Sequence, residues 1–174
     1  MNRKMINNRL LFFTFFILIQ TSCLHNDANI YLSSIDFNEN YQILSIDYDH
    51  EPDTALQQII YKSKVRNDGY GIILNVDQSL SENDIKKLTY DFQLQDINAV
   101  HTFNIQSGKT PDNNVLVAIE QARFVWIFSN NMYNLSGQEC QPVVKAFHNA
   151  VKSDGILIIH KMLKDKLIQC LELV

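Results

Sequence analysis

The chain has 174 residues, of which 15 are Lys or Arg and 19 are Asp or Glu, so its formal net charge at pH 7 is −4. This acidic balance argues against nucleic acid and anionic lipid headgroups as partners, because both bind basic surfaces. With 46% hydrophobic residues, the chain is long enough to bury the core of one domain.

The start of the chain has the pattern of an export signal. Residues 1–9 carry three basic side chains and no acid, residues 10–19 are apolar except for Thr14, and Ser22 stands before Cys23. A basic start, a short apolar stretch and small residues before a cut are typical of secretory signals. The apolar stretch would rise only about 15 Å as a helix, roughly half the hydrocarbon thickness of a bilayer, so it is not expected to span a membrane.

Cys23 directly after the small Ser22 resembles the lipobox of bacterial lipoproteins, in which the signal is removed and the Cys becomes the lipidated first residue. The chain departs from that pattern at Gln20, where Leu is common. The resemblance implies acyl chains on Cys23, palmitate among them, that hold the protein on a membrane of the bacterial cell envelope. Leu24, rather than Asp, follows the Cys and favours the outer membrane. The alternative is an ordinary cleaved signal, or an uncleaved anchor, with an unrelated Cys.

Three segments are therefore expected. Residues 1–22 are predicted to be a signal peptide, and their removal leaves 12 basic and 19 acidic residues, a net charge of −7. Residues 23–40 are predicted to be the lipidated Cys and a polar tether rich in Asn and Asp. Residues 41–174 are predicted to form the folded domain.

Strand and helix patterns alternate along residues 41–174. Residues 41–48 alternate apolar and polar side chains as a strand does, and residues 53–64 follow as a helix that Asp53 can cap. Further strands are predicted at residues 70–76, 99–105, 124–128 and 156–159. Helices are predicted between them at residues 81–94, 113–121 and 141–152. In the first of these helices, Ser81 and Asp84 have the spacing of a capping box. This alternation predicts an α/β fold with a doubly wound, mostly parallel sheet.

The order of these pieces also has a family resemblance. A buried strand at residues 71–76 is followed by the phrase at residues 91–105, then by Gln-Ala-Arg-Phe-Val-Trp-Ile-Phe-Ser at residues 121–129, then by a helix, Gly155 and a strand up to Ile159. This order resembles the cyanophycinase-like peptidases, serine hydrolases with the class I glutamine-amidotransferase-like α/β fold. The resemblance covers roughly residues 55–165 and implies that fold.

The catalytic residues of that family are missing from the matching positions. The family has Gly-Gly-Asp-Gln where this chain has Asn-Asn-Met-Tyr at residues 130–133, and a Gly-Thr-Ser-Ala-Gly nucleophile turn where this chain has His-Lys-Met-Leu at residues 160–163. A nucleophile elbow needs small residues around an exposed Ser beside backbone N–H donors. We therefore expect no catalytic residue to be carried over, and a catalytically inactive domain with a binding or structural role.

The end of the chain leads to two alternatives. Only residues 164–174 follow the last predicted strand, whereas acid and base partners usually follow the nucleophile in this fold. The domain is therefore expected to be incomplete at its C-terminus, and a truncated, non-functional fragment is one alternative. The other is a hydrolase with a non-standard nucleophile such as Cys140 or Ser129.

A candidate residual crevice consists of polar residues that follow two neighbouring predicted strands. These residues are Ser129, Asn130, Asn131 and His160. Ligands bind at the carboxyl ends of strands in open α/β sheets, so the expected partner is a small polar ligand or an unknown protein. The alternative for His160 is that it only packs or faces solvent.

Other polar residues suggest weaker sites. Cys140 and Cys170 are a candidate disulfide in an exported chain, and buried thiols are the alternative. Asp77 and Gln78 could line a site or only form a turn. The acidic cluster at residues 47–51 could bind a cation, but it is expected to be a solvated loop. We expect no cofactor and no metal site, because the other histidines lack ligand spacing: His25, His50, His101 and His148.

Overall fold

The computed structural model describes residues 35–47, 52–66, 69–130 and 141–173. The expected signal peptide, Cys23 and the first part of the expected tether lie outside the described residues, as do Asn131 and Cys140. The fold below is that of the compact unit that begins at Ile35.

Within the described residues, six strands form one sheet in the order β1-β2-β6-β5-β3-β4. The strands are β1 (Ile35–Asn38), β2 (Ile43–Ile46), β3 (Gly71–Val76), β4 (Val100–Ile105), β5 (Phe124–Phe128) and β6 (Ile156–His160). All neighbouring strands from β2 to β4 pair in parallel, and β1 pairs antiparallel with β2. The predicted mostly parallel α/β sheet is therefore confirmed.

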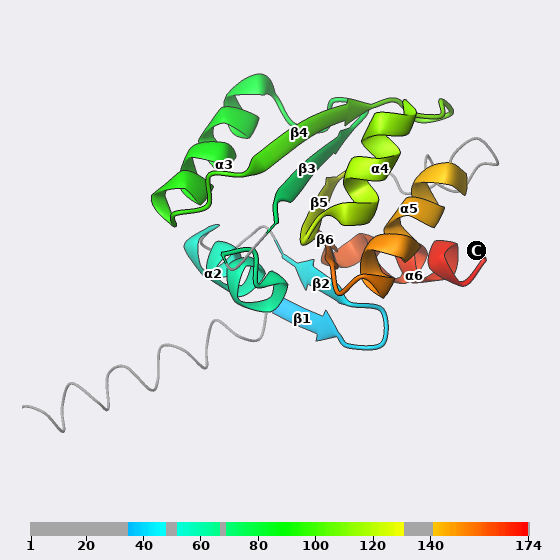
Figure 1. Ribbon diagram of the computed structural model, residues 1–174, viewed down its shortest axis with the longest axis horizontal. Coiled ribbons are helices and arrows are strands. Elements are labelled where there is room, and N and C mark those ends of the chain that lie inside the picture. Colours follow the sequence, from blue (N-terminus) through cyan, green and yellow to red (C-terminus); the bar gives the residue numbers. More distant parts are fainter. Residues whose placement is uncertain (1–34, 48–51, 67–68, 131–140, 174) are drawn as a thin grey trace, which may run out of the picture. The chain divides into compact units, whose positions relative to one another are not determined.

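Helices cover both faces of this sheet (Figure 1). They are α2 (Pro52–Ser63), α3 (Glu82–Leu94), α4 (Asn113–Gln121), α5 (Gln141–Lys152) and α6 (Lys164–Glu172), with a 3-10 turn at Lys161–Leu163 before α6. The predicted helices at residues 113–121 and 141–152 are confirmed at both ends. The first helix begins at Pro52, one residue before the predicted start at Asp53. Proline is favoured in the first turn, where its missing N–H leaves no helical hydrogen bond unmade.

Two hydrophobic cores lie on the two faces of the sheet. Strand side chains alternate between the faces, so Phe124 and Trp126 of β5 pack with α2 and α3, whereas Val125 and Ile127 pack with α4, α5 and α6. All five residues of β5 are buried. This central strand therefore anchors both cores, as its continuous apolar run predicted.

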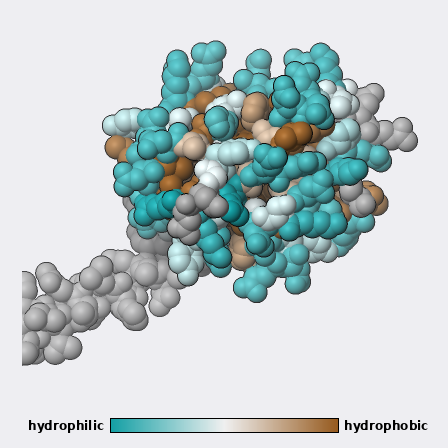
Figure 2. All heavy atoms as spheres, viewed as in Figure 1, coloured by the Kyte–Doolittle hydropathy of each residue, from teal (hydrophilic) through white to brown (hydrophobic). Residues whose placement is uncertain are grey.

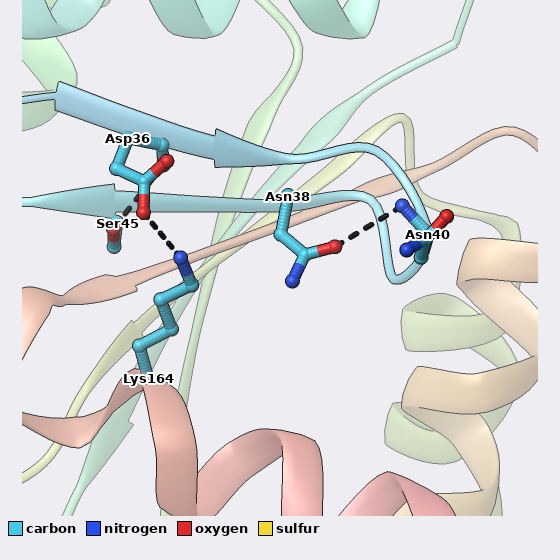
Figure 3. A network of polar contacts seen from close by, with 5 residues as sticks. All are labelled: Asp36, Asn38, Asn40, Ser45 and Lys164. Atoms are coloured by element: carbon cyan, nitrogen blue, oxygen red, sulfur yellow. Dashed lines mark hydrogen bonds and ion pairs between the residues drawn. The ribbon is translucent and has the colours of Figure 1, made fainter.

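The first strand corrects the predicted boundary of the domain. Residues 35–38 were expected to belong to the tether, but they form β1 and pair with β2. Figure 3 shows that the hairpin is held by polar contacts: Lys164 of α6 pairs with the Asp36 carboxylate, and the Ser45 hydroxyl donates to the Asp36 carbonyl at 3.1 Å. The folded unit therefore begins at Ile35 and not at Tyr41.

Hydrophilic side chains cover most of the face seen in Figure 2, and hydrophobic ones show in separate areas. The large exposed hydrophobic residues lie on different elements, for example Tyr61 on α2, Tyr90 on α3 and Val117 on α4. No helix in the described part of the chain is both long enough and apolar enough to cross a bilayer.

The capping box predicted before α3 is confirmed. The Asp84 N–H donates to Ser81 Oγ at 3.2 Å, and the Ser81 N–H donates to Asp84 Oδ2 at 3.3 Å. The Ser81 hydroxyl also donates to the Asp84 carboxylate at 2.6 Å. The hydrogen bond from the Ser81 hydroxyl has the largest effect on the pKa of Asp84, followed by the one from the Ser81 N–H. Together they hold this pKa below its ordinary value of 3.8.

Replacing Ser81 by Ala is expected to lower the free energy of unfolding by about 1 kcal/mol at neutral pH. Because the folded-state pKa of Asp84 is lowered, its contribution is present above the unfolded pKa and is lost as the pH falls through the folded value. The difference between Ser81→Ala and the unmodified chain should therefore shrink below about pH 4. Urea unfolding at neutral and acid pH measures both effects, with Ser153→Ala as an exposed control. A deficit that does not change with pH would contradict this account.

Candidate functional site

The strand order reverses between β3 and β5. From β3 the chain passes through α3 to β4 on one side, and from β5 it passes through α5 to β6 on the other. Helix α3 packs on one face of the sheet and α5 on the opposite face. The connections therefore leave the carboxyl ends of β3 and β5 in opposite directions, which is the geometry at which open α/β sheets bind ligands.

A cavity of about 280 Å³ lies at this position, which we call the switch-point crevice. Its polar walls are Ser79, Ser129, Asn130 and His160, and its apolar walls are Leu80, Ile127 and Phe128. The structure thus brings together three of the four residues predicted from the sequence. The fourth, Asn131, lies outside the described residues. Ser79 and Leu80 were not predicted.

Ser79 connects the two strand ends. Its hydroxyl donates to the Val76 carbonyl at 2.6 Å and accepts the Asn130 N–H at 3.2 Å. Ser79 reaches this place because Asp77 and Gln78 both have left-handed backbone conformations, with φ of 51° and 56°. Two consecutive residues of this kind turn the chain sharply at the end of β3.

Asp77 also makes a contact across the sheet edge. Its carboxylate accepts the Ser107 N–H at 2.8 Å and so ties the end of β3 to the segment after β4. Asp77 and Gln78 form the turn, and they also line a hollow of about 740 Å³ whose other walls come mostly from residues 104–112. Both roles weighed for them are compatible with the structure. This hollow lies at the ends of β3 and β4, outside the switch point.

Asn75 fixes the loop between β3 and α3 through hydrogen bonds to Leu80. This side chain is buried near the end of β3 and accepts the Leu80 N–H at 2.8 Å. Its amide group donates to the Leu80 carbonyl at 3.2 Å and to Asn104 Oδ1 at 2.8 Å. Asn75 therefore fixes the position of Leu80, which lines the crevice.

His160 stabilises the 3-10 turn that follows β6. Its Nδ1 accepts the Met162 N–H at 3.3 Å, which caps the 3-10 turn, and its Nε2 lies 3.9 Å from Asp47 Oδ1. An Nδ1 that accepts a hydrogen bond places the proton of the neutral ring on Nε2, an assignment made from the hydrogen bonding. In a Ser–His–acid triad the acid pairs with Nδ1 and the serine with Nε2. The arrangement around His160 is therefore not that of a triad.

Ser79 is not placed as the serine of a nucleophile elbow. The Ser79 hydroxyl gives its proton to a backbone carbonyl rather than to an imidazole. Strand β6 continues through His160 directly into the 3-10 turn at Lys161–Leu163. Cys140, the other candidate nucleophile, lies outside the described residues. Its candidate disulfide partner, Cys170, is buried on α6.

Residue types that ligate metals do not gather in the described part of the chain: no group of three His, Cys, Asp or Glu residues is placed to hold an ion. No family model matches the chain, and no curated protein or solved structure matches it. The functional argument therefore rests on the geometry of the crevice.

Proposed function

We propose that this chain is a lipid-anchored protein of the bacterial cell envelope whose α/β domain binds a small polar ligand in the switch-point crevice without hydrolysing it. The observation that carries the proposal is the convergence of Ser79, Ser129, Asn130 and His160 on one cavity. Pockets with a few convergent polar groups at a switch point are the usual place for a ligand in this class of sheet.

The finer fold assignment belongs to the same proposal. We place the domain with the class I glutamine-amidotransferase-like folds, as a degenerate relative of the cyanophycinase-like peptidases. The phrase at residues 121–129 falls on the central strand β5, and the helix, Gly155 and strand order falls on α5 and β6, as the resemblance requires. The main departure is the 3-10 turn after His160 in place of a nucleophile elbow.

The residues of the crevice indicate the chemistry of its ligand. Hydroxyl, amide and imidazole groups can donate and accept hydrogen bonds, and none carries a fixed charge. A neutral or zwitterionic molecule with amide and amino groups matches such walls better than a multiply charged one. The proposed glutamine-amidotransferase-like fold suggests a ligand that contains glutamine. Glycyl-L-glutamine is a small zwitterion of this kind with amide and amino groups, so it is a suitable probe.

Glycyl-L-glutamine is expected to bind the full chain, and His160→Ala is expected to weaken that binding by about fivefold or more, because a hydrogen-bonding wall is lost. His101→Ala, on the edge strand β4, is the matched control and should leave binding unchanged. Titration calorimetry measures the affinities, and chromatography of the mixture measures any hydrolysis. Equal affinities for both variants, or no binding at all, would reject the crevice as the site. Release of glycine that is lost in Ser129→Ala would favour the alternative, a hydrolase with a non-standard nucleophile.

The anchor is tested separately, by intact mass of the full-length gene product extracted from membranes. The unmodified protein should lack residues 1–22 and carry added acyl mass on Cys23, and Cys23→Ala should carry none. Acyl chains bind bilayers through about 0.8 kcal/mol per buried methylene, so Cys23→Ala should also move to the soluble fraction if it is still exported and cleaved. A single unlipidated mass for both proteins would reject the anchor and leave the crevice proposal standing.

A further inference from the structure

Strand β4 forms one edge of the sheet, and no strand in the described part of the chain pairs with its outer side (Figure 1). The Gly71 N–H of β3 donates to the Ala99 carbonyl at 2.9 Å, and Gly71 lies opposite Val100. In a parallel ladder with this register, the N–H and C=O groups of residues 99, 101, 103 and 105 face β3. The backbone groups of the residues between them therefore point outward: Val100, Thr102 and Asn104.

The composition of β4 leaves this edge open to another strand. Proteins usually protect an exposed edge by a short strand, by charged side chains or by proline. The opposite edge follows that rule, because β1 has four residues and carries Asp36, which pairs with Lys164. Strand β4 has six residues, Val-His-Thr-Phe-Asn-Ile, and none of them is Lys, Arg, Asp, Glu or Pro. None of the usual protections is therefore present on β4.

The edge is complementary to itself when two copies meet antiparallel about a two-fold axis at Thr102. In that register Thr102 faces its own counterpart, and Val100 faces Asn104 of the second copy. The outward N–H groups of each copy then meet the outward C=O groups of the other, so every one of them gains a partner. On the other face of the strand, His101 lies opposite Phe103 of the second copy, an aromatic pair of the kind that stabilises antiparallel strands.

We propose that β4 is the interface of a homodimer, in which the two six-stranded sheets join edge to edge into one continuous sheet. A two-fold homodimer requires a surface that is complementary to itself, and the register centred on Thr102 provides one. An unrelated strand could satisfy the same backbone groups, but the matching of side chains across the axis favours a second copy. The β4 edge does not line the switch-point crevice, so this proposal does not depend on the proposed function.

Charge reversal at the axis tests the interface. Sedimentation equilibrium of the full chain should show a dimer that dissociates on dilution. Thr102→Lys and Thr102→Glu each place two like charges opposite one another, so each should weaken the association by about tenfold or more. An equimolar mixture of these two variants places opposite charges across the axis and should form a dimer again. Thr102→Val, which has nearly the same shape and no charge, is the matched control and should keep the dimer.

Asn38→Lys, on the β1 edge, should leave the dimer unchanged. Thermal melts by circular dichroism show whether each variant is folded. If the charged variants do not fold, amide hydrogen exchange of the unmodified chain decides the question. The N–H groups of Val100, Thr102 and Asn104 should exchange slowly at dimer concentrations and fast on dilution.

Three results would overturn the proposal. The first is a monomer at all concentrations. The second is an association that folded Thr102→Lys and Thr102→Glu leave unchanged, or that their mixture does not restore. The third is fast exchange of the three amides while the chain is dimeric. All the variants keep residues 1–34, so association through that segment would give the second result.

Discussion

Replacing Gly71 by Ala is expected to lower the free energy of unfolding by about 1–3 kcal/mol, and by more if the core cannot rearrange. Gly71 of β3 pairs with Phe124 of β5, and a Cβ at residue 71 would stand only 1.9 Å from Cζ of that ring. The ring has little room to move away, because Phe124 is fully buried and stacked on Phe92 with ring centroids 5.1 Å apart. The added methyl group must therefore push a packed aromatic pair apart.

A double-mutant cycle tests whether the Phe124 ring is the cause. Phe124→Leu removes the ring atoms that the new Cβ would meet. In that background the cost of Gly71→Ala should fall by about 1 kcal/mol or more, because residues in contact couple in this range. Urea unfolding of the four proteins gives the coupling free energy. If Gly71→Ala costs the same in both backgrounds, the clash with the ring is not what makes glycine necessary.

The central part of the fold could be predicted because its residues carry strong local signals. A continuous apolar run such as residues 124–128 identifies a strand buried on both faces, and Ser81 with Asp84 marks the start of α3. The strand β1 was missed for a local reason as well. Its residues, Ile-Asp-Phe-Asn, alternate as an edge strand does, but the segment is short and follows a polar stretch rich in Asn. At four residues, periodicity alone does not separate a strand from a tether.

The site could be predicted only in part, because the sequence does not say which strands are neighbours. Parallel strands end at one edge, so Ser129, Asn130 and His160 could be placed together. Ser79 was missed because its place depends on the pairing of β3 with β5, which joins segments about fifty residues apart. The orientation of the His160 ring could not be predicted from the sequence either. It is set by a hydrogen bond from the Met162 N–H in a 3-10 turn, and no residue pattern predicts that turn. The fold follows mostly from local patterns, whereas the chemistry of the crevice follows from long-range pairing.

The other large effect is expected at Asn75. Replacing it by Leu keeps a similar volume but removes both hydrogen bonds to Leu80 and the one to Asn104. The cost should be about 2–3 kcal/mol, because backbone groups of Leu80 lose their partners in a half-buried place. The loop from Asp77 to Leu80 should also lose its fixed position, so that glycyl-L-glutamine binds the crevice more weakly.

Asn104→Ala is the matched control for Asn75→Leu, because it removes only the hydrogen bond between the two amides at the exposed side. It should cost less than about 1 kcal/mol and leave the affinity of the crevice unchanged. Urea unfolding and titration calorimetry on the same samples separate the two effects of Asn75. A loss of stability without a loss of affinity would show that Asn75 supports the sheet but does not position the crevice. Equal behaviour of Asn75→Leu and Asn104→Ala would show that the Leu80 hydrogen bonds matter for neither, because only Asn75 makes them.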